Sequence, residues 1–258
     1  MLGKCMKYEL KAFAKLMLPM LGVFAFTWII EVVLMNLGFK QGDFVILLLW
    51  ICFIPMMFLS VIGIPLVCCI FGAKRYNDVF FSKKAYLMRP LPVKGKTLVI
   101  SIVLNSVIWY VISAAVMILA LLVPSFSQDP AQFLMNLGSL LKSLIEDRAN
   151  WMSVAFSSFL TVLSVELMIM LAVTLASKHS GSRFGISFLY FLLISFVSSL
   201  FHGIFLRVFL GVFNTDSKDD SLFFTYFDIP TIIFRAVLSV GILIYLLWNA
   251  DRKADVIQ

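Results

Sequence analysis

Charged side chains are scarce in this chain of 258 residues, because Lys, Arg, Asp and Glu together make up only 14% of it. Soluble domains typically carry about 25% charged and about 45–50% apolar residues. Here the apolar share is 62%, which leaves too little polar surface to cover a water-soluble globule. The same numbers exclude a disordered chain, which needs low hydrophobicity and high charge. The composition therefore predicts a polytopic membrane protein.

Residues that usually carry chemistry are also few. The four cysteines form no C-x-x-C pair and no metal-ligand spacing, so we expect free thiols packed as small apolar side chains. The two histidines, His179 and His202, have no H-E-x-x-H pattern and no acidic cluster beside them. Gly95-Lys96-Thr97 lacks the earlier glycine of a phosphate-binding loop, because Pro90 stands there. We therefore expect no metal or cofactor bound by this chain, and no enzymatic activity of its own.

Six apolar stretches are long enough to cross a membrane as helices, which takes roughly 20 residues. They cover about residues 16–39, 44–72, 98–123, 151–177, 184–213 and 229–250. The sequence thus predicts an all-α polytopic membrane protein with a six-span domain over 16–258 and a short amino-terminal segment, 1–15, before it. Pro55 and Pro65 predict a kink in the second span, because proline removes a backbone donor.

The basic residues predict the orientation. With both termini in the cytoplasm, 15 of the 21 Lys and Arg fall in cytoplasmic segments and four in outside segments, as the positive-inside rule requires. The net charge of +7 then reflects topology and attraction to anionic lipid. We do not expect nucleic acid as a partner, because the chain has no soluble basic domain.

Three segments outside the spans are predicted to form helices. Residues 1–15 place apolar side chains near one stripe, flanked by Lys4, Lys7, Glu9 and Lys11, which is typical of an interfacial helix. The alternative is a plain basic flank that only sets topology. The outside loop 124–150 has apolar residues at helical spacing, which predicts an amphipathic helix on the outer surface or over the bundle. A role in gating or substrate contact is the alternative there.

The cytoplasmic loop 74–97 mixes basic residues with eight large apolar side chains. A loop that only turns the chain does not need them, so they bury against lipid headgroups, against this protein or against a partner. Pro90 and Pro92 end any helix in this region. We expect an amphipathic cytoplasmic helix at about 74–82 and a short second helix or turn at 84–88.

Four ionisable residues fall within or near the predicted spans: Glu31, Glu166, Arg207 and Arg235. A charge at the middle of a bilayer costs roughly 2.5–3.5 kcal/mol on insertion scales, so it usually faces protein or water. Three interpretations stay open. The charges pair internally, such as Glu31 with Arg235 or Arg207, or they line a substrate path, or the arginines extend to the interface.

The blocks Arg75-Tyr76-Asn77-Asp78-Val79-Phe80, Ala85-Tyr86-Leu87 and Leu91-Pro92-Val93 resemble the first cytoplasmic loop of permease subunits of bacterial ABC exporters of the type-2 class. Lys7-Tyr8-Glu9-Leu10-Lys11 is similar to the amino-terminal interfacial helix of that family. The chain departs from the family pattern at Lys83-Lys84-Ala85, where an acidic-Gly pair is common, so the electrostatics of the loop differ.

The resemblance implies a transport subunit in the bacterial cell membrane. Two six-span permease chains, the same or different, would form the pathway, and separate cytoplasmic ABC ATPase subunits would bind ATP and Mg. The implied ATPase-coupling residues are Arg75, Tyr76, Asp78, Val79, Phe80, Tyr86 and Leu87. The apolar, aromatic-rich spans favour an amphipathic or hydrophobic substrate, such as an antimicrobial peptide or a lipid-like molecule. The alternative is a membrane-embedded sensor or scaffold that docks a cytoplasmic partner through loop 74–97.

Overall fold

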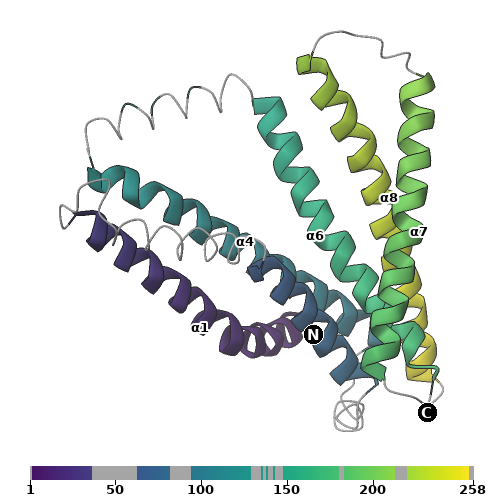
Figure 1. Ribbon diagram of the computed structural model, residues 1–258. Coiled ribbons are helices and arrows are strands. Elements are labelled where there is room, and N and C mark those ends of the chain that lie inside the picture. The colour runs from purple at the N-terminus through teal and green to yellow at the C-terminus, as the bar shows by residue number, and fades with distance from the viewer. Residues whose placement is uncertain are drawn as a thin grey trace. The chain divides into compact units, whose positions relative to one another are not determined.

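Every element in the described part of the computed structural model is a helix (Figure 1). The structure describes residues 2–36, 63–81, 94–128, 148–179, 183–212 and 220–255, with the single positions 135, 138 and 142. The labelled helices are α1 (Leu2–Asn36), α4 (Gly95–Gln128), α6 (Arg148–Ala176), α7 (Arg183–Val212) and α8 (Asp220–Asp255). A further helix covers 63–80.

Four segments of the described helices are long and apolar enough to cross a membrane. They are Gly95–Val116, Met152–Ala176, Phe184–Phe209 and Ile229–Asp251, with mean hydropathies of 2.1 to 2.3. They fall on the last four apolar stretches predicted from the sequence, which confirms that these stretches are helical and long enough for several spans. The predicted span 44–72 lies mostly outside the described residues, and 16–39 ends outside them. The six-span count therefore stays a prediction.

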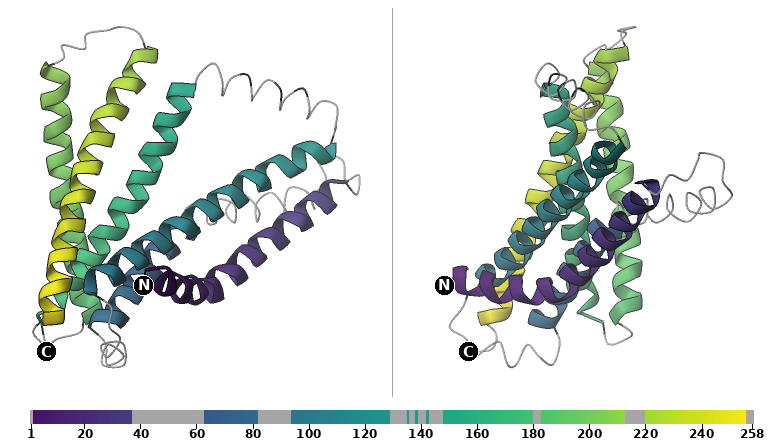
Figure 2. Two further views of the ribbon diagram at one scale, coloured as in Figure 1. Left: turned by 180° about the vertical axis from the view of Figure 1, so that it is seen from behind. Right: turned by 90° about the vertical axis from the view of Figure 1, so that its left-hand side faces the viewer.

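Two predicted helix boundaries are absent from the structure. The expected interfacial helix at 1–15 and the start of the first span form one continuous helix, α1, which contains Pro19 and bends along its length (Figure 2). The expected cytoplasmic helix at 74–82 begins no new element either, because helix 63–80 runs through residues 72–74 without a break. Gly72 lies within this helix, where it permits close packing instead of ending it.

The chain divides into two compact units. The first comprises residues 1–5, 69–103 and 147–258, and the second comprises 6–68 and 104–146. In the first unit, α6 packs along both α7 and α8, and α7 also contacts α8 (Figures 1 and 2). α6 ends at Ala176 in a tight turn, where the His179 amide donates to the Ala176 carbonyl at 3.1 Å.

One apolar cluster forms the core of the first unit, and we call it the basal cluster. Its buried members are Tyr76, Val79, Val99, Ile102, Val103, Leu167, Met168, Met170, Ile242, Leu246 and Ala250. They come from helix 63–80, the first turns of α4, the second half of α6 and the last turns of α8. Parts of four helices therefore pack together in the region where helix 63–80 ends and α4 begins.

In the second unit, a buried stripe runs along α1. Glu9, Phe13, Met17 and Leu21 recur every four residues and are all buried, while Lys7 and Lys11 are exposed. The Sγ atom of Cys68 lies 4.0 Å from the Met17 sulfur, so this stripe contacts helix 63–80. This part of α1 has one buried and one exposed side, and Glu9, which was expected to flank the apolar stripe, lies on the buried side, while the interfacial location stays a prediction.

Candidate functional site

Tyr76 and Val79, two of the predicted ATPase-coupling residues, are buried inside this chain. Their exposed fractions are 1% and 6%, and both belong to the basal cluster. The Tyr76 ring lies 5.0 Å from the Phe80 ring and 5.7 Å from the Phe81 ring, between ring centroids, so the three form an aromatic group at the end of helix 63–80. The apolar residues of loop 74–97 were expected to be buried against lipid headgroups, this protein or a partner. Tyr76 and Val79 are buried against this protein.

The Tyr76 hydroxyl joins helix 63–80 to α6. It lies 2.9 Å from Thr174 Oγ1, and the Thr174 hydroxyl itself donates to the Met170 carbonyl at 2.9 Å. Because a hydroxyl has only one hydrogen to donate, Tyr76 is the donor and Thr174 the acceptor. Burial is the largest cause that raises the pKa of Tyr76, to about 12, and Tyr245 adds to the rise while the Thr174 hydrogen bond opposes it. Tyr76 therefore stays a neutral donor at physiological pH.

The other predicted coupling residues differ in exposure. Arg75, Asp78 and Phe80 are half-buried, and Lys74 beside them is exposed. Tyr86 and Leu87 lie outside the described residues. The polar side of helix 74–80 is consequently the part that another molecule can reach, whereas Tyr76 and Val79 hold this helix to the spans.

Loop 74–97 is fixed at its second end as well. A Cβ on Gly95 would lie 2.7 Å from the Ala250 carbonyl oxygen, so the start of α4 approaches the backbone of α8 more closely than any other residue allows. Next to this contact, Lys96 Nζ pairs with Asp251 Oδ2 at 2.6 Å. The Gly95-Lys96 pair that superficially suggested a phosphate-binding loop thus serves helix packing. The described residues on the two sides of 82–93 are therefore both anchored, Tyr76 to α6 and Gly95 to α8.

A second feature is a cavity of about 220 Å³ between α6, α7 and α8, which we call the polar cavity. Its polar lining residues are Thr161, Ser164, Ser195, Ser198, Ser199, His202 and Arg235. Apolar residues such as Val165 and Met168 complete the wall. Polar groups are costly within apolar spans, so a cavity that gathers seven of them is a candidate binding site.

Arg235 and His202 are held by hydroxyl groups. The Arg235 guanidinium donates to Thr161 Oγ1 on α6, and His202 Nε2 lies 3.2 Å from Thr231 Oγ1 on α8. The His202 ring also contacts the Phe234 ring, at 5.1 Å between centroids. Arg235 therefore points into the helix bundle toward α6. The bond to Thr161 shows the guanidinium in contact with α6, and whether Arg235 lines a path or extends to the interface stays a prediction.

Glu166 and Arg207, two of the other ionisable residues singled out from the sequence, do not line this cavity. Glu166 is 2% exposed and packs on Gly72, where a Cβ would lie 2.6 Å from Glu166 Oε1. Arg207 is exposed on α7. The side chain of Glu31 lies outside those that the structure describes, so its predicted pairing with Arg235 or Arg207 stays a prediction.

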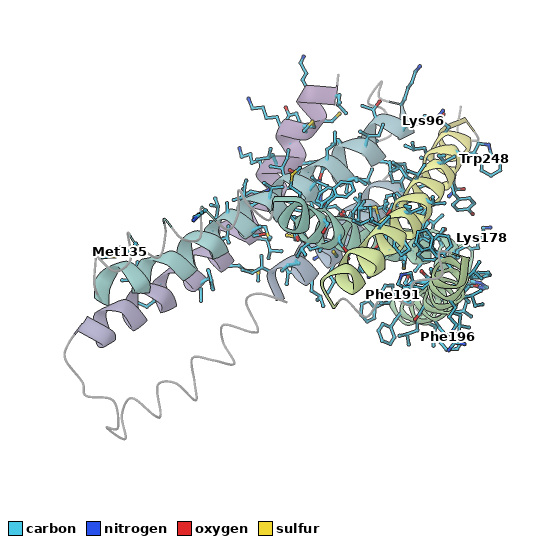
Figure 3. All side chains as sticks on the ribbon, turned by 90° about the horizontal axis from the view of Figure 1, so that it is seen from above. Lys96, Met135, Lys178, Phe191, Phe196 and Trp248 are labelled. Atoms are coloured by element: carbon cyan, nitrogen blue, oxygen red, sulfur yellow. The ribbon has the colours of Figure 1, made fainter. Side chains whose placement is uncertain are left out.

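The outer surface of α7 is almost entirely apolar. None of the residues in Phe184–Phe209 is buried, and Phe196 is 65% exposed. Figure 3 shows Phe196 on the outward side of α7 and Phe191 on the side toward α8, where Phe191 packs against the basal cluster. A surface of this kind requires lipid or another membrane-embedded chain around it.

Two features of the sites were not predicted from the sequence. Thr174 belongs to no recognisable pattern, whereas the polar stripe of α7 does. Ser195, Ser198 and His202 follow one another at three and four residues, the spacing that places side chains on one helix face. Within an otherwise apolar stretch, this spacing was enough to predict a polar face directed at neighbouring helices.

No protein-family model, no curated protein sequence and no solved structure matches this chain. In the residues that the structure describes, no three His, Cys, Asp or Glu side chains come together as a metal site would require. Two features of the described residues therefore bear on the function: the two anchors of loop 74–97 and the polar cavity.

Proposed function

We propose that this chain is the transmembrane subunit of an ATP-driven exporter whose energy comes from a separate cytoplasmic ABC ATPase. The observation that supports this most is the double anchoring of loop 74–97. Its first end is held to α6 by the buried Tyr76–Thr174 hydrogen bond, and its second end to α8 by the Gly95–Ala250 contact. A segment that a motor moves must be rigidly joined to the parts that it drives.

The anchors give this movement a route into the spans. Protein interiors are close-packed and transmit displacement with little compression. A push on the loop would reach α6 through the aromatic group of Tyr76, Phe80 and Phe81, and α8 through the first turn of α4. The ATPase would contact the polar side of helix 74–80, with Arg75 and Asp78, and the residues Tyr86 and Leu87 beyond it.

The remaining parts of the proposal follow from the sequence. The chain carries no ATPase site of its own, and ATP and Mg bind to the partner. It lies in the bacterial cell membrane with both termini in the cytoplasm, and it forms the pathway with a second permease chain, the same or different. The substrate is amphipathic or hydrophobic, an antimicrobial peptide or a lipid-like molecule, because the exposed helix surfaces are apolar and the polar cavity is small.

A second candidate is a membrane-embedded sensor or scaffold that docks a cytoplasmic partner through the same loop. The exposed lysines near the anchors, Lys74 and Lys94, favour it, since they would suit an acidic partner other than an ATPase. The two candidates differ in one simple observation. An exporter subunit requires a Walker-type ATPase, which we expect to be encoded in a neighbouring reading frame and to co-purify with this chain.

The docking test uses residues that another protein can reach. With the ATPase co-expressed, the double variant Arg75→Glu/Asp78→Lys is expected to lose most of the co-purifying ATPase, and so is Tyr86→Ala/Leu87→Ala. Tyr76→Phe should keep it, because the buried ring still holds helix 74–80 in place. Lys178→Glu is the matched control, since Lys178 is an exposed cation in the separate turn after α6 (Figure 3).

Two results would decide against the proposal. If both double variants retain the ATPase as well as the Lys178→Glu control does, the docking surface is wrong. If no ATPase accompanies the unaltered chain, the sensor interpretation is favoured. Reconstituted vesicles then test transport directly, since ATP-dependent movement of a fluorescent amphipathic peptide or lipid is expected only with both subunits.

A further inference from the structure

The polar cavity has the chemistry of an anion site. Arg235 brings a permanent positive charge with five N–H donors in a planar fork, and only one of them is used in the bond to Thr161. Ser195, Ser198 and Ser199 of α7 line the same cavity, as does Ser164, whose hydroxyl donates to the Thr161 carbonyl at 2.8 Å. No Asp or Glu is among the residues that line the cavity in the described part of the chain. Among the described residues, the cavity therefore combines the positive charge of Arg235 with several hydroxyl groups and no carboxylate.

The cavity reaches the outer surface of α7 in the middle of apolar side chains. Ser199 lines the cavity and is exposed, so the polar lining extends to the helix surface at this residue. On the same helix, Phe196 is 65% and Leu200 is 53% exposed. A molecule that places a polar group in the cavity thus has an apolar surface along which the rest of it can lie.

The size of the cavity favours one polar group of a larger molecule. The cavity lies within the apolar segments, because His202 is seven residues before Phe209 and Arg235 is six residues after Ile229, about 10 Å from the segment ends at about 1.5 Å per residue. Sites that enclose whole small molecules usually measure about 300–1,000 Å³. A cavity of about 220 Å³ is smaller, and it suits one polar group of a larger molecule.

We infer that the polar cavity binds the phosphate headgroup of an anionic phospholipid, whose acyl chains lie along the outer face of α7. Arg235 pairs with the phosphate oxygens, which match the planar fork of a guanidinium. The hydroxyls of Ser195, Ser198 and Ser199 donate to the remaining oxygens. This inference is independent of the proposed transport function, because binding requires neither the ATPase nor a second permease chain.

The test measures lipid binding to the purified full chain in detergent by native mass spectrometry. We expect saturable binding of phosphatidylglycerol, and clearly weaker binding of phosphatidylcholine, whose choline cancels the charge. Arg235→Gln should weaken phosphatidylglycerol binding by about tenfold to a hundredfold, since a hydrogen bond to a charged group contributes about 1.5–3 kcal/mol. Arg207→Gln is the matched control, because it removes the same charge from an exposed position of α7 outside the cavity lining.

A second variant keeps the test decisive if Arg235→Gln fails to fold. Ser199→Leu leaves the bond from Arg235 to Thr161 in place and puts an apolar side chain at the exposed edge of the cavity. It should weaken phosphatidylglycerol binding at least tenfold while the melting temperature stays within a few degrees of the unaltered chain. Binding that survives both Arg235→Gln and Ser199→Leu would refute the site.

The outcomes also separate the sources of phosphate. Competition by inorganic phosphate, with no binding of phosphatidylglycerol, would show a site for a free anion and overturn the lipid assignment. Equal weakening by Arg207→Gln and Arg235→Gln would show general attraction to basic residues, and it too would overturn it. Loss confined to Arg235→Gln and Ser199→Leu, with no effect of inorganic phosphate at equal concentration, supports the headgroup site.

Discussion

The buried hydrogen bond between Tyr76 and Thr174 makes a specific prediction about three variants. Tyr76→Phe removes the donor, Thr174→Val removes the acceptor, and the double variant removes both while it keeps nearly the same shape. Because Tyr76 is 1% exposed, water cannot replace either partner without a change of structure. The three free energies of unfolding should therefore differ in a fixed order.

The geometry gives the size of each effect. Tyr76→Phe loses one neutral hydrogen bond and leaves the Thr174 hydroxyl bonded to the Met170 carbonyl, so we expect a cost of about 0.5–1.5 kcal/mol. Thr174→Val leaves the Tyr76 hydroxyl buried without a partner, which costs about 1–3 kcal/mol. The double variant should cost less than the sum of the two, by about 0.5–3 kcal/mol, as expected for residues in direct contact. Tyr76→Ala, which also removes the ring, should cost about 3–5 kcal/mol.

The assay is the unfolding of the purified chain in mixed micelles, followed as a half-life at fixed temperature where unfolding is irreversible. Tyr190→Phe is a suitable control, because Tyr190 is a half-buried tyrosine of the first unit, on α7, whose hydroxyl lies 2.8 Å from Nε2 of the exposed His179. The reasoning fails if Thr174→Val is no worse than Tyr76→Phe and the two effects add. That result would mean that the hydroxyls are solvated and that the anchor rests on ring packing alone.

Three further predictions concern the same end of the helices. Burial raises the pKa of Tyr76 to about 12 from about 10, so the unfolded chain loses this proton at lower pH than the folded chain. The free energy of unfolding should therefore fall between about pH 10 and about pH 12, by about 1.4 kcal/mol per pH unit. Tyr76→Phe should remove this part of the loss of stability at alkaline pH. Gly95→Ala should destabilise by about 1–3 kcal/mol through its clash with the backbone of α8, whereas Gly241→Ala, with nothing within 4 Å, should be neutral or stabilising in the same melting experiment. Lys96→Ala should cost less than about 1 kcal/mol and show little dependence on Asp251, because the pair is exposed to solvent that screens it.

The last four apolar stretches could be predicted from the sequence because their length and hydropathy favour a helix over any other structure. Runs of more than 20 apolar residues have few alternatives to a helix, as the segments Met152–Ala176 and Phe184–Phe209 show. The helix boundaries were harder. The change from apolar to basic residues at 73–74 indicates where the surroundings of the chain become polar. It does not indicate where the helix ends, and the helix continues through residue 80.

The exposure of individual loop residues could not be predicted for a different reason. The pattern around Tyr76 shows that apolar side chains need burial, but the partner that buries them lies 98 positions away in the sequence, on Thr174 and its neighbours in α6. The amphipathic pattern is the same whether the other surface is lipid, an ATPase or this chain. Local periodicity identifies the buried face of a helix, and only the packed structure identifies what covers it.

The absence of any buried residue in the apolar segment of α7 has a consequence for how this helix can change over generations. A side chain that contacts mainly lipid acyl chains can be exchanged for another apolar one with little loss of stability, because it is not packed against other side chains of the protein. A saturation mutagenesis map should therefore show α7 as a tolerant helix, with free exchange among Leu, Ile, Phe and Val at positions such as Phe188 and Phe201. Substitutions should be tolerated poorly only along one face of α7, at Ser195, Ser198 and His202, which line the polar cavity.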